Sequence, residues 1–472
     1  MASTGRKPNL VYVFADQLRY QSCGFAGDER AITPNIDRLA TEGVNFYNAV
    51  SGSPMCAPYR ASLFTGKYAS STGMAINELR INPNHDCIGH VLHRNGYQTS
   101  YIGKWHLWAN QLGRQHDTQN SYIPPGPHRL GFDGEWSAYN FHHTYFDTYY
   151  HRDSPERITI PGYEPDGQTD LAIDYLKRAS TTDDPFALFL SIGTPHDPWT
   201  QDNVPSEYYE MFREVNFPLP ENYREENDPY GDAWAMMSDE QRAKLPEWMR
   251  VYYAMTTNLD WNVGRLLSAI DELGLQEDTI FVFTSDHGEM FGAQGRKAKN
   301  IFYEEAVRIP FLMRWPETIS EGLTTDVCLN TPDIMPTLLS MMELPIPEDV
   351  EGSDLSPAAF GETFEEPEAA FMQGMGCTAK WEDGYEWRAL RTKQHTYAVH
   401  RPDGGEKLFD NIADPFQTRN LTDIPTSQGI LNELRALLKQ RMYALNDTFE
   451  ACTWYRDNWT EDRVILRTAT MH

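Results

Sequence analysis

The sequence has few cysteines and no long apolar run. Its 472 residues include only six cysteines, Cys23, Cys56, Cys87, Cys328, Cys377 and Cys452. They form no close pairs and lack the spacing of zinc ligands, which argues against a disulfide framework and against a structural zinc site. No stretch of about 18 apolar residues occurs, so no membrane-spanning helix is predicted.

Basic residues are also scarce. The chain has 40 Lys and Arg against 68 Asp and Glu, a formal net charge of −28. Such a chain repels nucleic acid and anionic membrane surfaces at long range, so we expect neither as a partner. A solvated acidic surface accounts for most of this charge. An anionic substrate would therefore need a local cluster of cations.

The first residues, "MASTGRKPNL", lack the apolar segment of a signal peptide. As written, the sequence predicts a cytoplasmic protein, and a periplasmic or secreted one if a leader has been removed. The sequence predicts no oligomeric state.

The length of the chain favours one large domain and a smaller one. Near residue 365 the pattern changes to short strands in "AAFMQGMG", "YEWRALRT" and "HTYAVHR", followed by a helix in "SQGILNELRALLKQRMYALND". We therefore expect a catalytic α/β domain over 1–365. An α+β subdomain with a short antiparallel sheet and a terminal helix is expected over 366–472.

Four short apolar runs in the first domain resemble buried parallel strands. They are rich in Val, Ile, Phe and Tyr and cover 9–16, 97–106, 185–196 and 278–287. Amphipathic helical segments lie between them, for example "TPNIDRLATEG" and "VYYAMTTNLDWNVGRLLSAIDELG". This alternation predicts an α/β fold with a large doubly wound, parallel or mixed sheet flanked by helices.

Chemically useful side chains follow each of these strands. In open α/β sheets, ligands bind outside the carboxyl ends of the strands. One such residue alone would be an ordinary loop residue, but four strand ends of this kind favour one shared site. The residues are Asp16 and Gln17, Lys104 and His106, His196, and Asp286 and His287.

The stretch "SPMCAPYRASLFTG" (53–66) places Cys56 in an unusually constrained setting. It resembles the sulfatase signature, Cys-x-Pro-x-Arg followed by Thr-Gly. "GKWH", "TPH", "SDHGE", "KNIFYEEAVRIPFL" and "KLFDNIADPFQTRNL" resemble later motifs of that family in the same order. The resemblance spans nearly the whole chain and implies the alkaline-phosphatase-like fold. It also implies that a maturase oxidises Cys56 to formylglycine, which then attacks the sulfate ester.

The resemblance further implies a divalent cation held by Asp16, Gln17, Asp286 and His287 beside the modified Cys56. Carboxylate oxygens favour Ca²⁺, with Mn²⁺ or Mg²⁺ as alternatives. Two positions depart from the family pattern. Many sulfatases carry a carboxylate where this chain has Gln17, and several carry Asn where it has His287.

The remaining roles combine charge with the resemblance. Arg60 would hold the formylglycine hydroxyls, and Lys104 and Lys299 would neutralise the sulfate oxygens. His196 would protonate the leaving alkoxide, and His106 would orient the aldehyde hydrate.

Three functions are compatible with these patterns. The aromatic and imidazole-rich stretch "EWSAYNFHHTYFDTYYH" (135–151) suits a sugar ring, which favours a carbohydrate sulfatase acting on a sulfated glycan. The alternative within the superfamily is a phosphonate monoester or phosphodiester hydrolase. A non-catalytic binding protein that retains the fold is the third interpretation.

Overall fold

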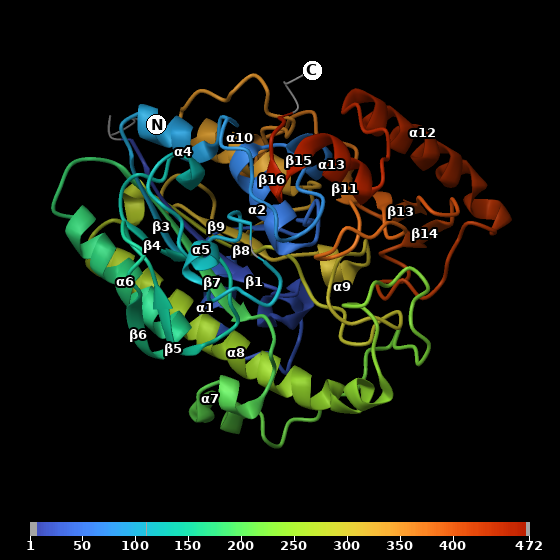
Figure 1. The fold of residues 1–472 in the computed structure, drawn as a ribbon, viewed down its shortest axis with the longest axis horizontal. Helices are drawn as coiled ribbons and strands as arrows, with labels where there is room; N and C mark the ends of the chain where they lie inside the picture. The colour runs from blue at the N-terminus through green and yellow to red at the C-terminus, as the bar shows by residue number, and fades with distance from the viewer. Residues whose placement is uncertain (1–6, 110, 469–472) are drawn as a thin grey trace.

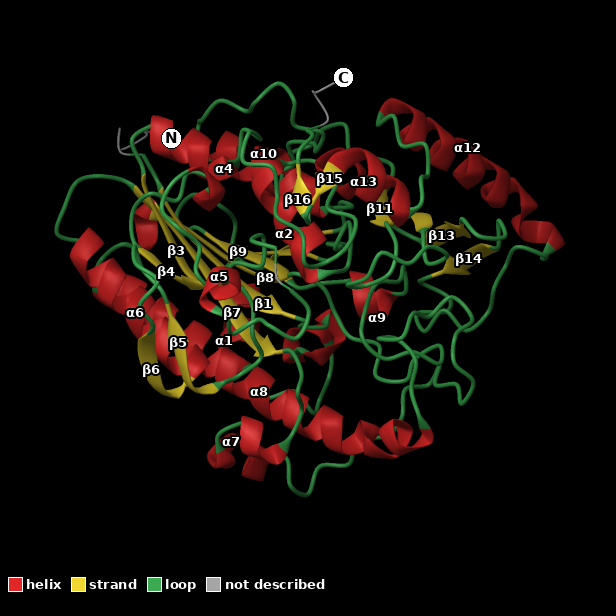
Figure 2. Ribbon diagram, in the orientation of Figure 1, coloured by secondary structure: helices red, strands yellow, loops and turns green. Residues whose placement is uncertain are grey.

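A computed structural model of the chain describes residues 7–109 and 111–468. Its centre is a mixed eight-stranded sheet with helices on both faces (Figure 1, Figure 2). The strand order is β10-β2-β9-β8-β1-β7-β3-β4, and β9 runs antiparallel to both its neighbours. The bounds are β1 (Asn9–Asp16), β2 (Val44–Phe46), β3 (Gln98–Lys104), β4 (Trp136–Tyr139), β7 (Phe186–Pro195), β8 (Thr279–Ser285), β9 (Phe311–Arg314) and β10 (Leu323–Thr325). The predicted large doubly wound sheet is confirmed.

The four strands expected from the sequence are the adjacent central strands β8, β1, β7 and β3. They pair in parallel, with Leu10 opposite Ala187 on β7 and Ile280 on β8. The sequence did not reveal β2, β4, β9 and β10, which have only three or four residues each. Strands this short carry too few apolar residues to be recognised as separate runs.

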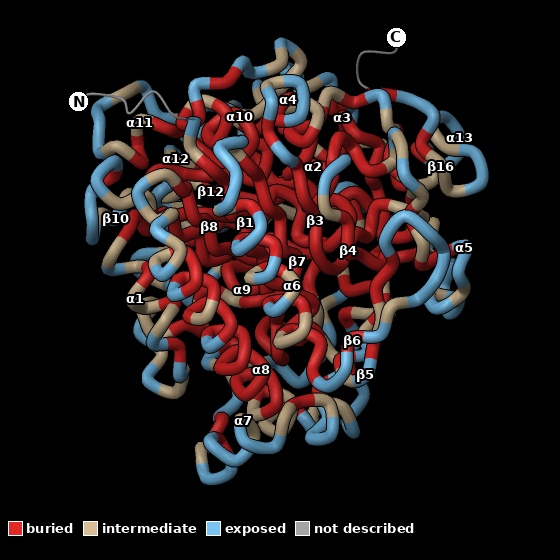
Figure 3. Tube along the Cα trace, turned by 90° about the vertical axis from the view of Figure 1, so that its left-hand side faces the viewer, coloured by how far each residue is buried: buried red, intermediate tan, exposed pale blue. Residues whose placement is uncertain are grey.

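Helices cover the two faces of the sheet as separate layers. Val11 and Val13 of β1 face one layer, whereas Tyr12 and Phe14 face the other. This alternation follows from the two-residue period of a strand. Apart from the exposed first residue of β3, the strands at the centre are buried, as Figure 3 shows. The first layer is α1 (Pro34–Glu42), α6 (Glu164–Ala179) and α8 (Asp239–Glu272), and the second is α2 (Cys56–Thr65), α4 (Ile88–Arg94) and α10 (Thr331–Met341).

Two long segments, 111–165 and 199–246, contain short elements of their own. The first contains α5 (Thr118–Ser121), β4, β5 (Phe146–Tyr150) and β6 (Ile158–Tyr163), and the second contains α7 (Ser206–Met211). The second segment also includes the first turns of α8, which begin earlier than its apolar pattern predicts. Ser238 caps this helix by accepting a hydrogen bond from the amide of Gln241.

A smaller antiparallel sheet follows, as expected for the C-terminal part. Its strands are β11 (Ala370–Gly374), β12 (Trp387–Arg391), β13 (His395–His400) and β14 (Glu406–Asp410). One face packs against Met290 and Phe302 of the large domain, and the other lies under α12 (Gln428–Ala444). The boundary between 365 and 366 stays a prediction. The chain continues past α12 into α13 (Cys452–Trp459), β15 (Thr460–Glu461) and β16 (Val464–Ile465), so α12 is not its last element.

The other short helices are α3 (Ala69–Thr72), α9 (Glu304–Val307) and α11 (Ser356–Ala359). None of the helices within 7–109 and 111–468 has both the length and the apolar character needed to cross a bilayer.

Candidate active site

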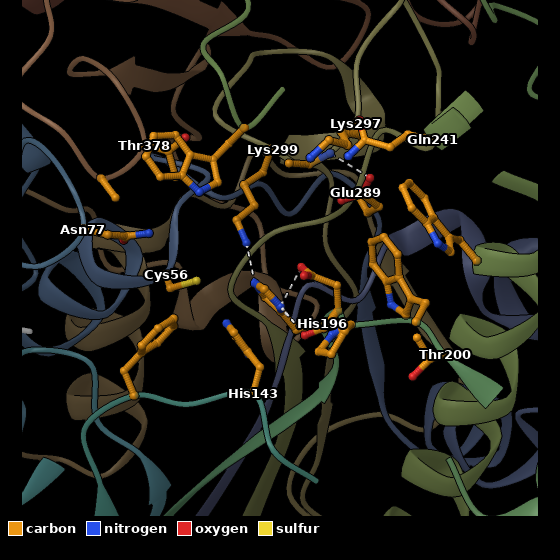
Figure 4. A pocket seen from close by; sticks show the side chains of 18 of the residues that line it. Cys56, Asn77, His143, His196, Thr200, Gln241, Glu289, Lys297, Lys299 and Thr378 are labelled. Carbon is orange, nitrogen blue, oxygen red and sulfur yellow. Dashed lines mark hydrogen bonds and ion pairs between the residues drawn. The ribbon is translucent and has the colours of Figure 1, made fainter. Parts of the chain in front are cut away.

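The ten predicted site residues converge at the carboxyl ends of the central strands (Figure 4 shows three of them). All ten are buried, and the most exposed, His196 and Lys299, are 6% accessible. The aspartates, the lysines and the arginine among them are charged groups that burial would destabilise unless they neutralise one another. The ten residues are Asp16, Gln17, Cys56, Arg60, Lys104, His106, His196, Asp286, His287 and Lys299.

Cys56 is the first residue of α2, a helix whose residues are all buried. Gly66 ends this helix in the left-handed region at φ 64°, which explains the Thr-Gly end of the motif. Burial raises the pKa of the Cys56 thiol, but the ammonium groups of Lys104 and Lys299 lower it well below its usual range. The N-terminus of a helix also favours negative charge. The position is therefore built to hold a nucleophile.

Cys56 lies within a cluster of metal-type ligands. The nearest ligand atoms of Asp16, Cys56, Asp286 and His287 all lie within 4.8 Å of one another. The Cys56 Sγ is 3.3 Å from His287 Nε2 and 3.6 Å from Asp16 Oδ1. The buried Oδ2 of Asp286 has no hydrogen-bond partner among the described residues. These donors fit a divalent cation, which would use the free oxygen.

The charges of the cluster agree with this interpretation. Burial raises the pKa of Asp286 to about 6, and the neighbouring Asp16 carboxylate adds to the increase. Burial also acts on Asp16, yet Lys104 and two imidazoles hold the pKa of that carboxyl well below its usual range. Two carboxylates this close repel each other, and a bound cation removes the repulsion.

Gln17 has a fixed amide orientation. Its backbone lies in the left-handed region at φ 71°, which is uncommon outside glycine. Its Nε2 donates to Glu289 Oε2 at 2.7 Å, and its Oε1 accepts from Lys299 Nζ at 2.5 Å. Glu289 is fully buried and also accepts from the amides of Phe291 and Ala298. These two hydrogen bonds direct the amide NH₂ of Gln17 towards Glu289 and its amide oxygen towards Lys299.

Arg60 lies one helical turn after Cys56 and is completely buried. Its Nη1 donates to the carbonyl oxygen of Lys104 at 2.6 Å and to Ser191 Oγ at 2.8 Å. Its Nη2 is 3.5 Å from Asp16 Oδ2 and 3.7 Å from Asp286 Oδ2. Lys104 Nζ donates to Asp16 Oδ2. Arg60 and Lys104 therefore offset the negative charge of the two carboxylates.

His196 is held by groups on both ring nitrogens. Its Nδ1 is 3.0 Å from Asp197 Oδ1, and its Nε2 is 2.7 Å from Lys299 Nζ. Burial and Lys299 lower the pKa of His196, but the carboxylates of Asp197 and Asp16 outweigh them and raise it to about 9. The ring of His143 stacks on that of His196 with centroids 3.9 Å apart and planes at 10°. His196 is therefore a positioned group whose pKa is raised by the carboxylates of Asp197 and Asp16.

His106 follows β3 with φ 54° and stacks on Phe141, with ring centroids 4.4 Å apart. Its Nε2 is 3.8 Å from Glu78 Oε1. Neither ring nitrogen has a hydrogen-bond partner among the described residues. The ring is thus free to bond a group placed beside Cys56.

A cavity of about 750 Å³ leads to this cluster. It is large enough for a ligand of several rings and has the mixed apolar and polar lining typical of binding sites. Cys56, His196 and Lys299 line its inner end (Figure 4). Trp199, Trp234 and Trp248 also line it.

Three contributors were not assigned from the sequence. Glu289 stands in the quoted "SDHGE" stretch, but only its contact with Gln17 reveals what it does. Asp197 directly follows His196, a signal that could have been used. His143 comes from the aromatic-rich loop, and no pattern in that loop distinguishes it from its neighbour His142.

The fold and the strand-end cluster define a class of enzyme. Buried cations face a candidate nucleophile beside a metal-type cluster, an arrangement that binds and cleaves an anionic ester in an alkaline-phosphatase-like fold. The chain belongs to the sulfatase family, whose pattern it matches over residues 8–344. Residues 292–444 match the C-terminal region of N-sulphoglucosamine sulphohydrolase. The protein is a sulfuric ester hydrolase.

Individual relatives agree with this assignment. An ulvan-active sulfatase of Formosa agariphila is 37% identical, over 95% of this chain and 84% of the relative. An endo-4-O-sulfatase of Bacteroides thetaiotaomicron is 28% identical, over 98% of this chain and 96% of its own. The crystal structure of YidJ from Bacteroides fragilis superposes with a TM-score of 0.82 at 31% identity, over 96% of this chain and 99% of that one.

Proposed function

We propose that the protein removes sulfate from a sulfated carbohydrate, with Cys56 oxidised to formylglycine by a maturase and Ca²⁺ as the metal. The observation that carries this proposal is the place of Cys56, within 4.8 Å of three metal-type ligands at the end of a roomy cavity. The relatives named above act on ulvan or on 4-O-sulfate groups. Aromatic walls in the cavity suit the faces of sugar rings.

Asp16, Gln17, Asp286 and His287 would hold the metal. When bound, it would lower the pKa of the nucleophile and neutralise sulfate oxygens. Glu289 contributes by fixing the Gln17 amide, so that a neutral side chain offers its oxygen and not its NH₂ group. Two carboxylates and an amide supply oxygen donors. We prefer Ca²⁺ to Mn²⁺ or Mg²⁺ because Ca²⁺ binds oxygen ligands and accepts a variable number of them.

Formylglycine supplies two geminal hydroxyls when hydrated, one to attack sulfur and one to release the sulfate afterwards. Arg60, one turn further along α2, and His106, whose two ring nitrogens have no hydrogen-bond partner among the described residues, would hold these hydroxyls. Lys104 and Lys299 lower the pKa of the Cys56 thiol, and they would likewise favour a deprotonated formylglycine hydroxyl and neutralise the sulfate. His196, protonated through Asp197, would give its proton to the leaving alkoxide.

The substrate class is tested with a panel of sulfated monosaccharides and oligosaccharides, with phosphonate monoesters and phosphodiesters as controls. We expect sulfate release from at least one sulfated sugar at a kcat/KM well above that for every phosphorus ester. Faster hydrolysis of a phosphonate monoester or phosphodiester would favour the alternative hydrolase. Turnover of an aryl sulfate without turnover of any sugar sulfate, by fully matured and metal-loaded protein, would contradict the carbohydrate assignment.

Replacing His196 by alanine should slow sugar sulfates far more than activated aryl sulfates. A sugar alkoxide is a poor leaving group that needs a proton, whereas an aryl oxide with a low pKa leaves without one. We expect a loss of about 10²- to 10⁴-fold in kcat for the sugar sulfate, the usual contribution of general acid catalysis, and a much smaller loss for the aryl sulfate. Equal losses on both substrates would remove the acid role from His196.

The pH profile should report the contact between Asp197 and His196. Because the pKa of His196 is raised to about 9, its acid form is present below that pH and is lost as pH rises through it. Asp197→Asn removes the charge that raises this pKa, so the alkaline limb of kcat for a sugar sulfate should move down by about one unit or more. Asp202→Asn, a change of an exposed carboxylate five residues further along the chain, serves as the control. An unmoved limb in Asp197→Asn would show that another group sets it.

A further inference from the structure

The cavity extends beyond the cluster to an outer wall formed by Trp199, Trp234 and Trp248 with Lys297. Trp199 and Trp248 lie with ring centroids 5.8 Å apart, and the Nε1 of Trp199 donates to the carbonyl oxygen of Pro195 at 2.8 Å. Flat aromatic faces next to a charged group can bind a sugar ring and an anion together. Nothing in the chemistry of sulfate cleavage itself requires this wall.

Three segments far apart in the sequence fix the part of the wall that carries Trp234. Asp232 Oδ1 accepts from the amides of Trp234 and Ala235 at 3.0 Å each. Asp232 Oδ2 accepts from the amide and the hydroxyl of Thr378 at 2.7 and 2.6 Å. The amide of Lys297 donates to the carbonyl oxygen of Ala235 at 2.9 Å. The wall is therefore held in place before any ligand arrives, which lowers the entropic cost of binding.

Lys297 is a half-buried cation in this wall, and its ammonium forms no hydrogen bond or ion pair with the residues that the structure describes. Lys244, which also lines the cavity, is by contrast bonded to Glu240. Lys299, two residues further on, points towards His196 (Figure 4). Lys380 lies close by, with its Nζ 5.4 Å from the ring centroid of Trp234. In a protein of net charge −28, a lysine left unpaired in a cavity indicates an anionic ligand.

We propose that Lys297 binds a second anionic group of the glycan, a carboxylate or a second sulfate, while Trp234 packs against the sugar that carries it. This inference rests on the proposed function, because it assumes that a sulfated glycan enters the cavity. The exposed Lys380 adds to the positive electrostatic potential near Trp234. The enzyme therefore selects a glycan with two anionic groups, one at Cys56 and one at the outer wall, over a glycan with the scissile sulfate alone.

The test measures a ratio within each enzyme. One pair of oligosaccharides differs only by a uronic acid in place of a neutral sugar, and a second pair differs only by a second sulfate in place of a hydroxyl. For each variant, kcat/KM for the dianionic glycan is divided by kcat/KM for its partner. A general defect in folding or maturation lowers both values alike and cancels. The pair that shows the larger ratio identifies the anionic group as carboxylate or sulfate.

We expect the wild-type ratio to exceed one and to fall about tenfold in Lys297→Met, the size of effect seen when one partner of a partly buried ion pair is removed. Lys297→Arg should keep most of the ratio, and Lys297→Glu should bring it below one. Lys439→Met, a change of an exposed lysine on α12 with the same loss of charge, should keep the wild-type ratio.

An unchanged ratio in both Lys297→Met and Lys297→Glu, for both pairs, would overturn the inference, as would a wild-type ratio of one. A failure of the proposed function looks different. In that case the wild-type enzyme hydrolyses an aryl sulfate but none of the four glycans, and no ratio exists.

Discussion

Cys56→Ala is expected to abolish sulfate release from every substrate. Cys56 is the first residue of α2 and lies against His287 and Asp16 at 3.3 and 3.6 Å, so its replacement removes the nucleophile and one side of the metal-type cluster together. Loss of the nucleophile costs a serine protease about 10⁶-fold in kcat, and we expect a loss of similar size here. The measurement is sulfate release under single-turnover and steady-state conditions.

The matched control is Cys328→Ala, which also removes a buried free thiol. Cys328 packs in a cluster that joins the small sheet to loops and α9 of the large domain, and it is 1% exposed. Its replacement should cost stability through a small cavity but leave turnover in place. Wild-type activity in Cys56→Ala would show that another group attacks the ester.

Peptide mass analysis gives an independent check on the modification. Protein matured with the oxidising enzyme should contain formylglycine at position 56, with the sulfur lost, and unmatured protein should retain the thiol. Turnover should rise in proportion to the converted fraction. Full activity in protein whose Cys56 is entirely unconverted would contradict the formylglycine mechanism.

The sequence predicted the centre of the fold better than its edges. The strands β1, β3, β7 and β8 are buried on both faces, so each is a continuous apolar run that can be recognised without a partner. The edge strands of three or four residues depend on pairing with neighbours far along the chain. Such pairing cannot be predicted from a local sequence pattern. The beginning of α8 was also missed, because the capping by Ser238 precedes its apolar pattern by more than ten residues.

The same contrast applies to the site. Residues that end a strand or stand in a dense motif, such as Asp16 and Cys56, could be assigned because their position along the chain already implies the cluster. Glu289 and His143 act through contacts across the fold, the one with Gln17 and the other with His196. Each lies far from its partner in the sequence, so no local pattern links the two residues. Only the folded structure reveals contacts between residues so far apart in the sequence.

Gln17 illustrates how a departure from the family pattern is accommodated. An amide supplies less charge to a cation than a carboxylate does and can turn its NH₂ group inward. The buried Glu289 prevents that turn, because its carboxylate accepts from Nε2 and from two backbone amides at the same time. Glu289 also keeps a negative charge close to the site. In the proposed metal site, Glu289 would thus offset the substitution of an amide for a carboxylate.

Removal of the metal is expected to have the second largest effect. Asp16 ends β1 and Asp286 directly follows β8, and one ligand atom of each lies within 4.8 Å of ligand atoms of His287 and Cys56. Without a cation, the two carboxylates repel each other, which is why burial together with Asp16 raises the pKa of Asp286 to about 6. Extensive chelation should lower kcat by about 10³-fold or more, since a metal contributes several kcal/mol to charge stabilisation. Asp286→Ala should have the same effect, and Asp202→Ala should not.

Two further readouts separate a catalytic metal from an incidental one. Metal analysis of active protein should find close to one divalent ion per chain, and re-addition of Ca²⁺ should restore more activity than Mn²⁺ or Mg²⁺. Added Ca²⁺ should also raise the thermal unfolding midpoint of the wild-type protein, because a ligand that binds only the folded state stabilises it by about 2.7 kcal/mol at a hundred times its Kd. The shift should vanish in Asp286→Ala, whose site lacks the buried oxygen that has no hydrogen-bond partner among the described residues. Full turnover by protein shown to be free of divalent ions would rule out the cluster as a metal site and leave Arg60 and Lys104 as the counter-ions of the two carboxylates.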